Sequence, residues 1–328
     1  MSWENKKVVV TGAGGFIGSH LVERLLELGA EVTAFVRYNS RNDAGVLDFI
    51  GDRKRELKVV SGEIRELETV RNLTQAADVV FHLAALVGIP YSYVHTSEVV
   101  EVNTIGTLNV LSAAKEHGSQ KVVVTSTSEV YGSALYVPID EAHPKQAQSP
   151  YSASKIAADA IALSFYHSFD QPVAVVRPFN TYGPRQSDRA IIPTIISQAL
   201  LKNEIRIGST TPTRDFTFVG DTVEGMLRIG ESDAAIGQEI NLGSGCEISI
   251  GELAEKIAKL LNAKLVIGEG QERKRPAKSE VARLLSSNTK AKQLLGWQPE
   301  VSLEQGLKLT IDWIKSNPGL YSPDEYRI

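Results

Sequence analysis

The sequence predicts an α/β fold with a doubly wound parallel sheet and a smaller, mixed α/β lobe at its carboxyl end. Short runs of β-branched residues alternate with amphipathic stretches over the first 180 residues, which is typical of strand and helix units in a parallel sheet. After residue 180, turn-rich segments interrupt shorter elements. The chain has 328 residues, about twice the length of a typical domain. We therefore expect one domain over residues 1–180 and a second lobe over 181–328.

The same patterns place the individual elements. Four apolar residues repeat on one face of Ser19–Leu28, and Gly29 follows, so a helix is expected to end there. Longer amphipathic helices are expected over residues 97–117 and 152–169, and the charged run Asp52–Glu56 is expected to be a solvated helix face. The predicted strands are Val8–Thr11, Val32–Val36, Val59–Ser61, Asp78–Leu83, Lys121–Ser126, Val173–Val176 and Glu239–Leu242, the last of which is expected to return to the main sheet.

Composition excludes several classes of protein. The chain has 35 Lys and Arg against 39 Asp and Glu, a net charge of −4, so general binding of nucleic acid is not expected. Its one cysteine, Cys246, forms no internal disulfide and supplies no metal cluster, which favours a reducing compartment and predicts no metal site. The amino end lacks the pattern of a signal peptide, and no stretch approaches eighteen uninterrupted apolar residues. A cytoplasmic protein without a membrane span is expected.

A glycine-rich segment links the first strand to the first helix. Glycines at 12, 15 and 18 allow a tight turn and a close approach to a pyrophosphate, and they direct helix amides toward its charge. The alternative is a glycine-rich turn that binds nothing. The context favours a Rossmann-like, dinucleotide-binding domain, whose predicted contacts here are Gly12, Gly15, Phe16, Ile17 and Gly18.

The end of the second strand bears on which dinucleotide binds. A carboxylate there would accept from a ribose 2′-hydroxyl, but this chain has Val36 and Arg37, with Arg41 nearby. Cations suit a 2′-phosphate, so NADP is favoured over NAD, unless Arg37 is simply solvated. Glu63 and Ile64, after the third strand, are expected to flank the adenine. The fourth strand ends in a strand histidine, His82, followed by three residues beside the dinucleotide path, Leu83, Ala84 and Ala85.

Tyr151 and Lys155 stand four residues apart on the second long helix, and therefore on one face. This spacing allows Lys155 to lower the pKa of the phenol and to hold a cofactor ribose, while Tyr151 takes a proton from a substrate hydroxyl. A lone pair of this kind is a weak signal. It gains weight here because it lies after the fifth strand and downstream of a phosphate-binding loop.

These motifs together resemble the extended short-chain dehydrogenase/reductases that act on nucleotide sugars. The resemblance implies further cofactor contacts at Asn103, Thr125 and Pro178, a nucleotide-diphosphate sugar as substrate, and a homodimer formed through the two long helices. The same apolar stripe, which includes Ala158 and Phe165, is also explained by burial within one chain. The matching segments are the glycine loop, His82–Ala85, Val102–Thr107, Thr125–Gly132, Tyr151–Lys155, Arg177–Asn180, Arg214–Asp221 and Leu294–Trp297.

Three consecutive residues that follow the fifth strand narrow the choice of reaction. Thr127, Ser128 and Glu129 resemble the triplet of sugar 4,6-dehydratases of the GDP-mannose type and of those that start legionaminic-type synthesis from an N-acetylglucosamine nucleotide. After oxidation at C4, Glu129 would remove the C5 proton, Ser128 would help the C6 hydroxyl depart, and Thr127 would bind the C4 oxygen. Nucleotide-glucuronate oxidative decarboxylases carry the same triplet. In a 4-epimerase, Glu129 would have no catalytic role. The alternative, non-catalytic interpretation of Glu129 is a carboxylate at the start of a helix, where the helix dipole favours negative charge.

The resemblance also implies residues that hold the substrate. Asn180, Arg214 and Arg275 are expected to contact the phosphates or the nucleoside, since arginine suits bidentate phosphate contacts. Glu280 is expected to meet the nucleoside ribose, and Arg185 or Arg275 would face the carboxylate of a glucuronate. The alternative for residues 273–275 is a solvated cluster of charges. The alternative for the whole chain is a nucleotide-binding protein without catalytic activity. The presence of both Tyr151 and Lys155 argues against the second, and the base is left open.

Overall fold

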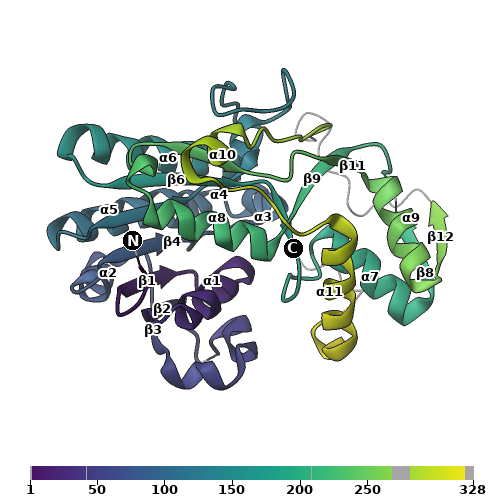
Figure 1. The fold of residues 1–328 in the computed structure, drawn as a ribbon, viewed down its shortest axis with the longest axis horizontal. Coiled ribbons are helices and arrows are strands. Elements are labelled where there is room, and N and C mark those ends of the chain that lie inside the picture. The colour runs from purple at the N-terminus through teal and green to yellow at the C-terminus, as the bar shows by residue number, and fades with distance from the viewer. Residues whose placement is uncertain (1, 42, 208, 268–280, 322–328) are drawn as a thin grey trace.

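The computed structural model describes residues 2–41, 43–207, 209–267 and 281–321. Figure 1 shows a large sheet with helices at one end of the molecule and a smaller group of helices and strands at the other. Arg275 and Glu280 therefore lie outside the described residues.

The main sheet has seven strands in the order β10-β6-β5-β4-β1-β2-β3. Every neighbouring pair is parallel. The chain moves outward from β1 to β3 and then returns to β4 on the other side of β1, which confirms the doubly wound arrangement. Each predicted strand forms within two residues of its expected bounds, including the returning one. The strands are β1 (Lys7–Thr11), β2 (Glu31–Arg37), β3 (Lys58–Gly62), β4 (Val79–His82), β5 (Lys121–Thr125), β6 (Val173–Pro178) and β10 (Glu239–Leu242).

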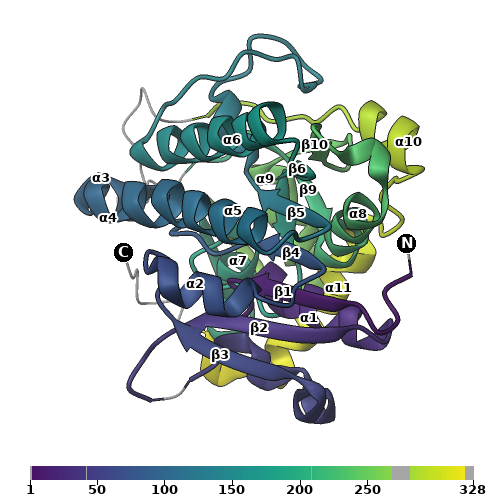
Figure 2. The same ribbon diagram turned by 90° about the vertical axis from the view of Figure 1, so that its left-hand side faces the viewer.

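Helices cover both faces of this sheet, as Figure 2 shows. Alternate residues of a strand face opposite layers: Val8 and Val10 pack in one core cluster with Leu21 and Met226, whereas Val9 packs in another with Val110. Because both faces are buried, the strands are continuous apolar runs. One layer contains α2 (Leu67–Thr74), α5 (Gly106–Glu116) and α6 (Pro150–Phe169), and the other contains α1 (Phe16–Glu27), α8 (Val219–Glu231) and α10 (Thr289–Leu295).

The helix predicted over 97–117 is interrupted. It forms as α4 (Thr96–Val100), a π-helical turn over Glu101–Ile105, and α5, after the short helix α3 (Ile89–Val94). A π turn inserts an extra residue into the helical ladder and is frequent at functional sites. The charged run Asp52–Glu56 lies in a 3₁₀ helix, Gly51–Glu56, in which no residue is buried, as expected for a solvated segment.

The second lobe has its own core. A three-stranded sheet has the order β11-β9-β7, and a separate pair joins β12 to β8. Residues such as Ile195, Leu253 and Leu307 fill the space between its helices. Its elements are β7 (Asn180–Tyr182), α7 (Ile191–Lys202), β8 (Glu204–Ile207), β9 (Thr213–Phe218), β11 (Glu247–Ser249), α9 (Ile250–Leu261), β12 (Lys264–Ile267) and α11 (Leu303–Ser316).

The chain passes between the two cores more than once. After β9 it returns to the main sheet as α8, and later as β10 and α10, so the cores are built from interleaved segments. The carboxyl ends of the parallel strands meet at one edge of the sheet, and β7 begins two residues after β6 ends. In such folds ligands bind at this edge, beside the point where the strand order reverses.

Candidate functional site

The glycine loop fits closely against the end of β4. Gly12 has a φ of +69°, and a Cβ there would lie 2.7 Å from the backbone nitrogen of Ala84. A Cβ on Gly18 would lie 2.3 Å from the carbonyl oxygen of Gly12. Gly15 stands just before α1 and offers no side-chain cap, and the first turn of the helix contains no acidic residue. The loop therefore leaves helix amides free for an anion, and these residues fit a dinucleotide pyrophosphate. Phe16 and Ile17 pack partly buried against the core beneath.

Threonine 11 joins the two strands that flank this loop. Its hydroxyl accepts from the backbone nitrogens of Leu83, at 3.1 Å, and Ala84, at 3.2 Å, and it contacts His82 Nδ1 at 2.8 Å. The other ring nitrogen of His82 lies 3.0 Å from the Thr107 hydroxyl. Burial lowers the pKa of His82 to about 3, with a smaller contribution from Lys155, so the imidazole is neutral. His82 is a buried strand histidine, as predicted. Ala85 follows on the same strand end and is partly buried.

The part of the site where the adenosine is expected to bind carries charges of both signs. Arg37 is exposed at the end of β2, opposite Gly62 in the register. A hydrogen bond from Arg65 at 2.9 Å lowers the pKa of Glu63, and the charge of Arg37 adds to this effect. Arg37 therefore lies near a carboxylate. Ile64 is buried and packs against Gly106.

Tyr151 lies in the first turn of α6, which begins after the capping residue Ser149. Its ring is 6% exposed and packs with Ile89 and Val99. Burial raises the pKa of the phenol well above its usual value, the negative charge of Glu129 adds to the increase, and a hydrogen bond with Thr127 opposes it. Thr127 and Glu129, which follow β5, therefore lie close to Tyr151 of α6.

Lys155 lies one helical turn further along α6 and is 2% exposed. Its ammonium donates to the carbonyl oxygen of Thr125 at 2.7 Å. Burial lowers its pKa to about 8, and Asp159 opposes that change. We expected Lys155 to lower the pKa of Tyr151. Among the described residues, the hydrogen bond that lowers the phenol pKa comes from Thr127, and an effect of Lys155 on the phenol stays a prediction. The ammonium is directed to β5.

The triplet Thr127–Glu129 lies where β5 leads into a 3₁₀ turn, η4 (Ser128–Tyr131). The Thr127 hydroxyl accepts from the backbone nitrogen of Glu129 at 3.2 Å and so caps the turn. Ser128 is buried, and Glu129 is partly exposed. The glutamate thus has a fixed backbone and a side chain that solvent can reach.

Asn103 has a full set of contacts in the π turn. Its amide oxygen accepts from Leu86 N at 2.8 Å, and its amide nitrogen donates to Leu86 O at 3.1 Å and to the Ser154 hydroxyl at 2.9 Å. These bonds hold the loop after β4 against α6. Asn103 lies beside Tyr151's helix, and its role as a cofactor contact stays a prediction. Pro178 is buried at the end of β6.

Three polar atoms near the carboxyl ends of β5 and β6 are buried without a hydrogen-bond partner among the described residues. They are the hydroxyls of Thr125 and Ser126 and the amide oxygen of Asn180. Buried polar groups are normally paired, so such orphans mark places where a ligand or water completes the set. This supports Thr125 as a cofactor neighbour and Asn180 as a substrate neighbour.

Of the predicted substrate arginines, the structure describes Arg185 and Arg214, and each has its own partners. Arg214, on β9, is 8% exposed and donates to the Thr213 carbonyl at 2.8 Å. Arg185 forms an ion pair with Glu23 of α1 at 2.7 Å, and its guanidinium lies 5.8 Å from the ring centroid of Trp313 on α11. In this structure Arg185 thus joins the two lobes.

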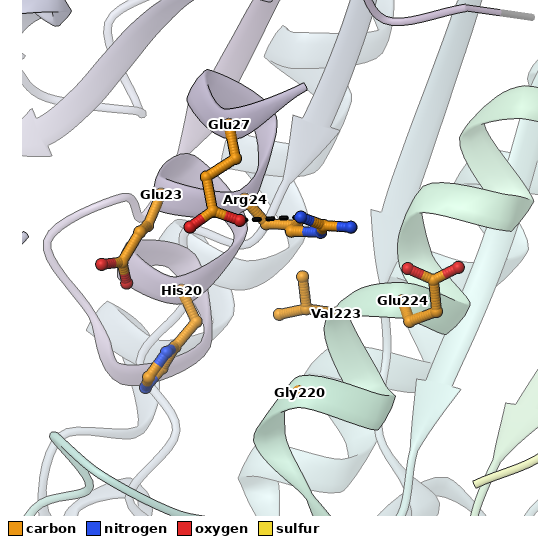
Figure 3. A pocket seen from close by; sticks show the side chains of 7 residues that line it. All are labelled: His20, Glu23, Arg24, Glu27, Gly220, Val223 and Glu224. Carbon is orange, nitrogen blue, oxygen red and sulfur yellow. Dashed lines mark hydrogen bonds and ion pairs between the residues drawn. The ribbon is translucent and has the colours of Figure 1, made fainter. Parts of the chain in front are cut away.

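A cavity of about 230 Å³ lies between α1 and α8, as Figure 3 shows. No predicted site residue lines it. The close-up shows charged side chains around the opening, and Arg24 and Glu27 form an ion pair at 2.7 Å. The candidate site is therefore defined by the strand ends and α6 instead of by this cavity. Its lining residues are His20, Glu23, Arg24, Glu27, Gly220, Val223 and Glu224.

Sequence reasoning missed a buried polar network behind Tyr151 and Lys155. Arg177 of β6 is fully buried and bonds to Asp159 of α6 and to the Tyr131 hydroxyl. In the sequence, Asp159 lies among Ala158, Ile161 and other apolar residues of the stripe, so it was not recognised as part of a polar network. A charged residue on a buried helix face was the available signal, because such charges are almost always paired.

Two negative findings concern the described residues. None of the described helices combines the length and the apolar content that crossing a membrane requires. Within the same residues, no three His, Cys, Asp or Glu side chains are grouped so that they could hold a metal ion.

Comparison with known proteins agrees with this geometry. Residues 9–310 match the family described as GDP-mannose 4,6 dehydratase. The chain is 31% identical to human dTDP-D-glucose 4,6-dehydratase over 325 residues, covering 95% of this chain and 91% of that protein. It is 33% identical to UDP-glucuronic acid decarboxylase 4 of Arabidopsis thaliana, covering 93% and 68%. It is also 33% identical to UDP-glucose 4-epimerase of Mycolicibacterium smegmatis, covering 94% and 99%.

A solved structure gives the same result. The dTDP-glucose 4,6-dehydratase DesIV of Streptomyces venezuelae, solved with NAD and TYD bound, superposes with a TM-score of 0.86 at 28% identity. The match covers 97% of this chain and 99% of that one. The similar proteins thus share a fold and nucleotide-sugar chemistry and differ in the reaction they catalyse.

Proposed function

This chain belongs to the GDP-mannose 4,6 dehydratase family of extended short-chain dehydrogenase/reductase enzymes, and from that premise we propose that it is a nucleotide-sugar 4,6-dehydratase. One observation carries the proposal: Glu129 lies in η4 with its backbone fixed by Thr127, close enough to Tyr151 for its negative charge to raise the pKa of the phenol. An acid–base residue beside the group that deprotonates the C4 hydroxyl is what elimination across C5 and C6 needs. The N-acetylglucosamine nucleotide proposed as substrate rests on the sequence resemblance alone.

The first half of the reaction is oxidation at C4. Tyr151 takes the proton of the C4 hydroxyl, Thr127 donates a hydrogen bond to the C4 oxygen, and Lys155 holds a cofactor ribose. A bound dinucleotide supplies an acceptor for the C4 hydrogen as hydride. Burial makes the phenol hard to ionise, so Tyr151 needs the positive charge of its surroundings, and Lys155 must stay protonated to provide part of it.

The second half is elimination. The C4 ketone acidifies the C5 proton, and Glu129 removes it. The C6 hydroxyl leaves as water after protonation by the acid form of Glu129, with Ser128 as a second donor. The hydride taken from C4 is then returned to C6, and a proton adds at C5. Carbon 4 is oxidised and carbon 6 is reduced, so the overall reaction loses one water and needs no further oxidant. Catalysis by a well-placed acid–base group contributes about 10²- to 10⁴-fold.

Mass spectrometry of products tests the proposal. The purified protein is incubated with NAD or NADP and a panel of nucleotide hexoses, N-acetylglucosamine nucleotides included. A product lighter than its substrate by one water is expected. Glu129→Gln should abolish that product and leave cofactor affinity unchanged, whereas Glu116→Gln, on an exposed ion pair with Arg71, should not alter turnover. Unaltered turnover by Glu129→Gln would remove Glu129 from the mechanism.

The same experiment separates the alternatives. Loss of carbon dioxide from a nucleotide glucuronate would indicate oxidative decarboxylation, which the Arabidopsis relative keeps open. That reaction needs a cation facing the carboxylate. Of the two candidates, Arg185 is paired with Glu23 and lies over the ring of Trp313, and Arg275 lies outside the described residues. A product of unchanged mass would indicate 4-epimerisation, the reaction of the mycobacterial relative, and would leave Glu129 unexplained.

We further propose that Arg37 selects the dinucleotide. Its exposed cation favours the 2′-phosphate of NADP, and the nearby carboxylate of Glu63 opposes it. The structural neighbour contains NAD. Titration with both dinucleotides decides: tighter binding of NADP that Arg37→Ala abolishes supports the proposal, and equal affinities of the variant and the parent for NADP contradict it.

A homodimer is proposed through the segment from α3 to α5 together with α6. Val94, Val100 and Ile105 expose large apolar surfaces along it, and such surfaces on soluble proteins often mark interfaces. Part of the α6 stripe is explained otherwise, since Ala162 and Phe165 pack within the chain. Light scattering should give twice the mass of one chain for the parent protein and a lower mass for Ile105→Glu.

A further inference from the structure

Asp159 is a buried carboxylate one helical turn beyond Lys155. It lies on α6 with no exposed surface, at the spacing of four residues that places two side chains on one helix face. One of its oxygens accepts from Arg177 Nε at 3.2 Å and Nη2 at 2.9 Å, and the other has no partner among the described residues. Removing two charges from water is costly, so this arrangement requires compensation or a task.

Arg177 fixes that carboxylate and connects it to the segment of Glu129. Its Nη1 donates to the Tyr131 hydroxyl at 2.8 Å, and Tyr131 is the last residue of η4. The Tyr131 hydroxyl donates in turn to Asn241 of β10 at 2.8 Å. Arg177 also pairs with Glu239 of β10, which is more exposed than Asp159. One guanidinium thus ties α6, η4, β6 and β10 together.

Among the groups that surround Lys155 in the described part of the chain, Asp159 is the one that supplies negative charge. On its own helix it has Asp159 and, one turn earlier, Tyr151, which is un-ionised because burial raises its pKa. On β4 it faces His82, which is neutral, and on β5 the carbonyl of Thr125. Arg177 on β6 lies beyond Asp159 and binds it.

We propose that Asp159 is a positioning residue for catalysis: its carboxylate, held by Arg177, keeps the buried side chain of Lys155 in the ammonium form. The role given to Lys155 rests on the proposed function, but oxidation at C4 is common to the dehydratase, decarboxylase and epimerase alternatives. The direction of the Lys155 pKa agrees, since Asp159 raises it against the effect of burial. Without this carboxylate, Lys155 would lose its charge within the physiological pH range.

The direct test is the titration of Lys155 in the cofactor-free protein. The ¹³Cε signal of Lys155 is assigned by its loss in Lys155→Arg, and its midpoint is measured in the parent chain and in variants. The parent midpoint is expected at about pH 8. Asp159→Asn should lower it by about one pH unit, the usual size of a nearby charge effect. Asp159→Glu should restore it toward the parent value.

Glu239→Gln is the matched control, because it removes another carboxylate from Arg177 without acting on Lys155. It should leave the Lys155 midpoint unchanged. If Asp159→Asn and Glu239→Gln both leave the midpoint in place, the pair is only structural and the proposal is overturned. If Asp159→Asn does not fold, Asp159→Asn combined with Arg177→Gln removes both charges and avoids an uncompensated guanidinium. A smaller fall in the same direction is expected there, because the positive charge of Arg177 is lost as well.

Activity provides a second readout. Asp159 also raises the pKa of Tyr151, so Asp159→Asn should displace the whole pH profile of kcat/KM toward acid by about one unit. A purely structural loss would scale the profile down without moving it, which would contradict the proposal. Failure of the proposed dehydration would appear in the product mass and would leave the Lys155 titration intact, so the two claims fail separately.

Discussion

The glycine loop and the Tyr151 cluster are two halves of one site built in different ways. At the loop, the backbone forms the binding surface: Gly12 and Gly18 leave no room for a Cβ, and the amides of α1 remain free. At the cluster, side chains distant in sequence set the charge of each group. Thr127 caps η4, Glu129 lies within it, Asp159 comes from a later turn of α6, and all three act on Tyr151.

This difference separates what a local motif can do from what the whole fold must do. A phosphate-binding turn needs only the right residues in succession after a strand. A phenol with a useful pKa needs burial and several charges at fixed distances, and those come from several elements. Substitutions at the two places should therefore fail in different ways, which the following experiments examine.

The largest effect is expected at the phenol. Tyr151→Phe removes the proton acceptor and should lower kcat by about 10²- to 10⁴-fold while binding of the dinucleotide is kept. Tyr182→Phe is the control, since Tyr182 is also buried and donates to the Leu303 carbonyl at 3.1 Å outside the site. It should cost about 1 kcal/mol of stability and leave kcat in place. Steady-state kinetics and denaturant unfolding measure both; a similar fall in kcat for the two variants would sink the assignment of Tyr151.

The next effect is expected at the loop. Gly12→Ala introduces a Cβ 2.7 Å from Ala84 N in a left-handed conformation, so dinucleotide affinity should fall about 100-fold or more. Gly51→Ala has a similar φ of +67° but nothing within 4 Å. It should cost only the backbone strain of about 1 kcal/mol and bind the dinucleotide normally. Calorimetric titration compares them, and normal affinity of Gly12→Ala would show that the loop does not approach the ligand.

A moderate effect on the free energy of unfolding is expected at acidic pH. The pKa of His82 is about 3 and that of His20 about 4 in the folded chain, both lowered by burial from about 6.5. Between pH 6.5 and these values the unfolded chain binds protons that the folded chain does not, so stability falls as pH falls. Each histidine contributes about 1.4 kcal/mol per pH unit within its window.

Chemical denaturation between pH 7 and pH 4 checks this expectation. His82→Gln should reduce the slope of the unfolding free energy against pH, whereas His167→Gln, at an exposed position, should leave it as in the parent. Equal slopes in the parent and both variants would mean that His82 has the same pKa in the folded and unfolded chains. The result would also bear on Lys155, because His82 faces it as a neutral group.

The smallest effect is expected at Thr127. Its hydroxyl bonds to Tyr151 and caps η4, so Thr127→Val should raise the phenol pKa further and lower kcat about tenfold. Thr127→Ser keeps the hydroxyl and should recover most of the rate. The acid limb of the kcat profile should move to higher pH in Thr127→Val alone. A limb that does not move would separate Thr127 from the phenol.

The fold was largely predictable because its signals are local. Every predicted strand and the first helix formed, since β-branched runs and an amphipathic face with Gly29 after it are read directly along the chain. The π turn at Glu101–Ile105 was not predictable, because the apolar pattern continues through it and Asn103 is held by the distant Leu86 and Ser154.

The site was predictable in its residues and less so in its electrostatics. Tyr151, Glu129 and Thr127 do meet, but the sequence did not predict that Thr127 lowers the phenol pKa or that the Lys155 ammonium donates to Thr125. Asp159 looked like one polar residue in an apolar stripe. Its partner Arg177 is eighteen residues away in sequence, and only the folding of β6 against α6 brings the two together.

The central claim is that C4 oxidation at Tyr151 is followed by elimination at Glu129. A nucleotide sugar accepted in the product assay, with deuterium in place of hydrogen at C4, tests it most directly by NMR of the product. We predict that the parent protein delivers the label to C6, which becomes a methyl group, and that Glu129→Gln forms no such product. A label that reappears at C4, with the hydroxyl at C6 intact, would contradict the account.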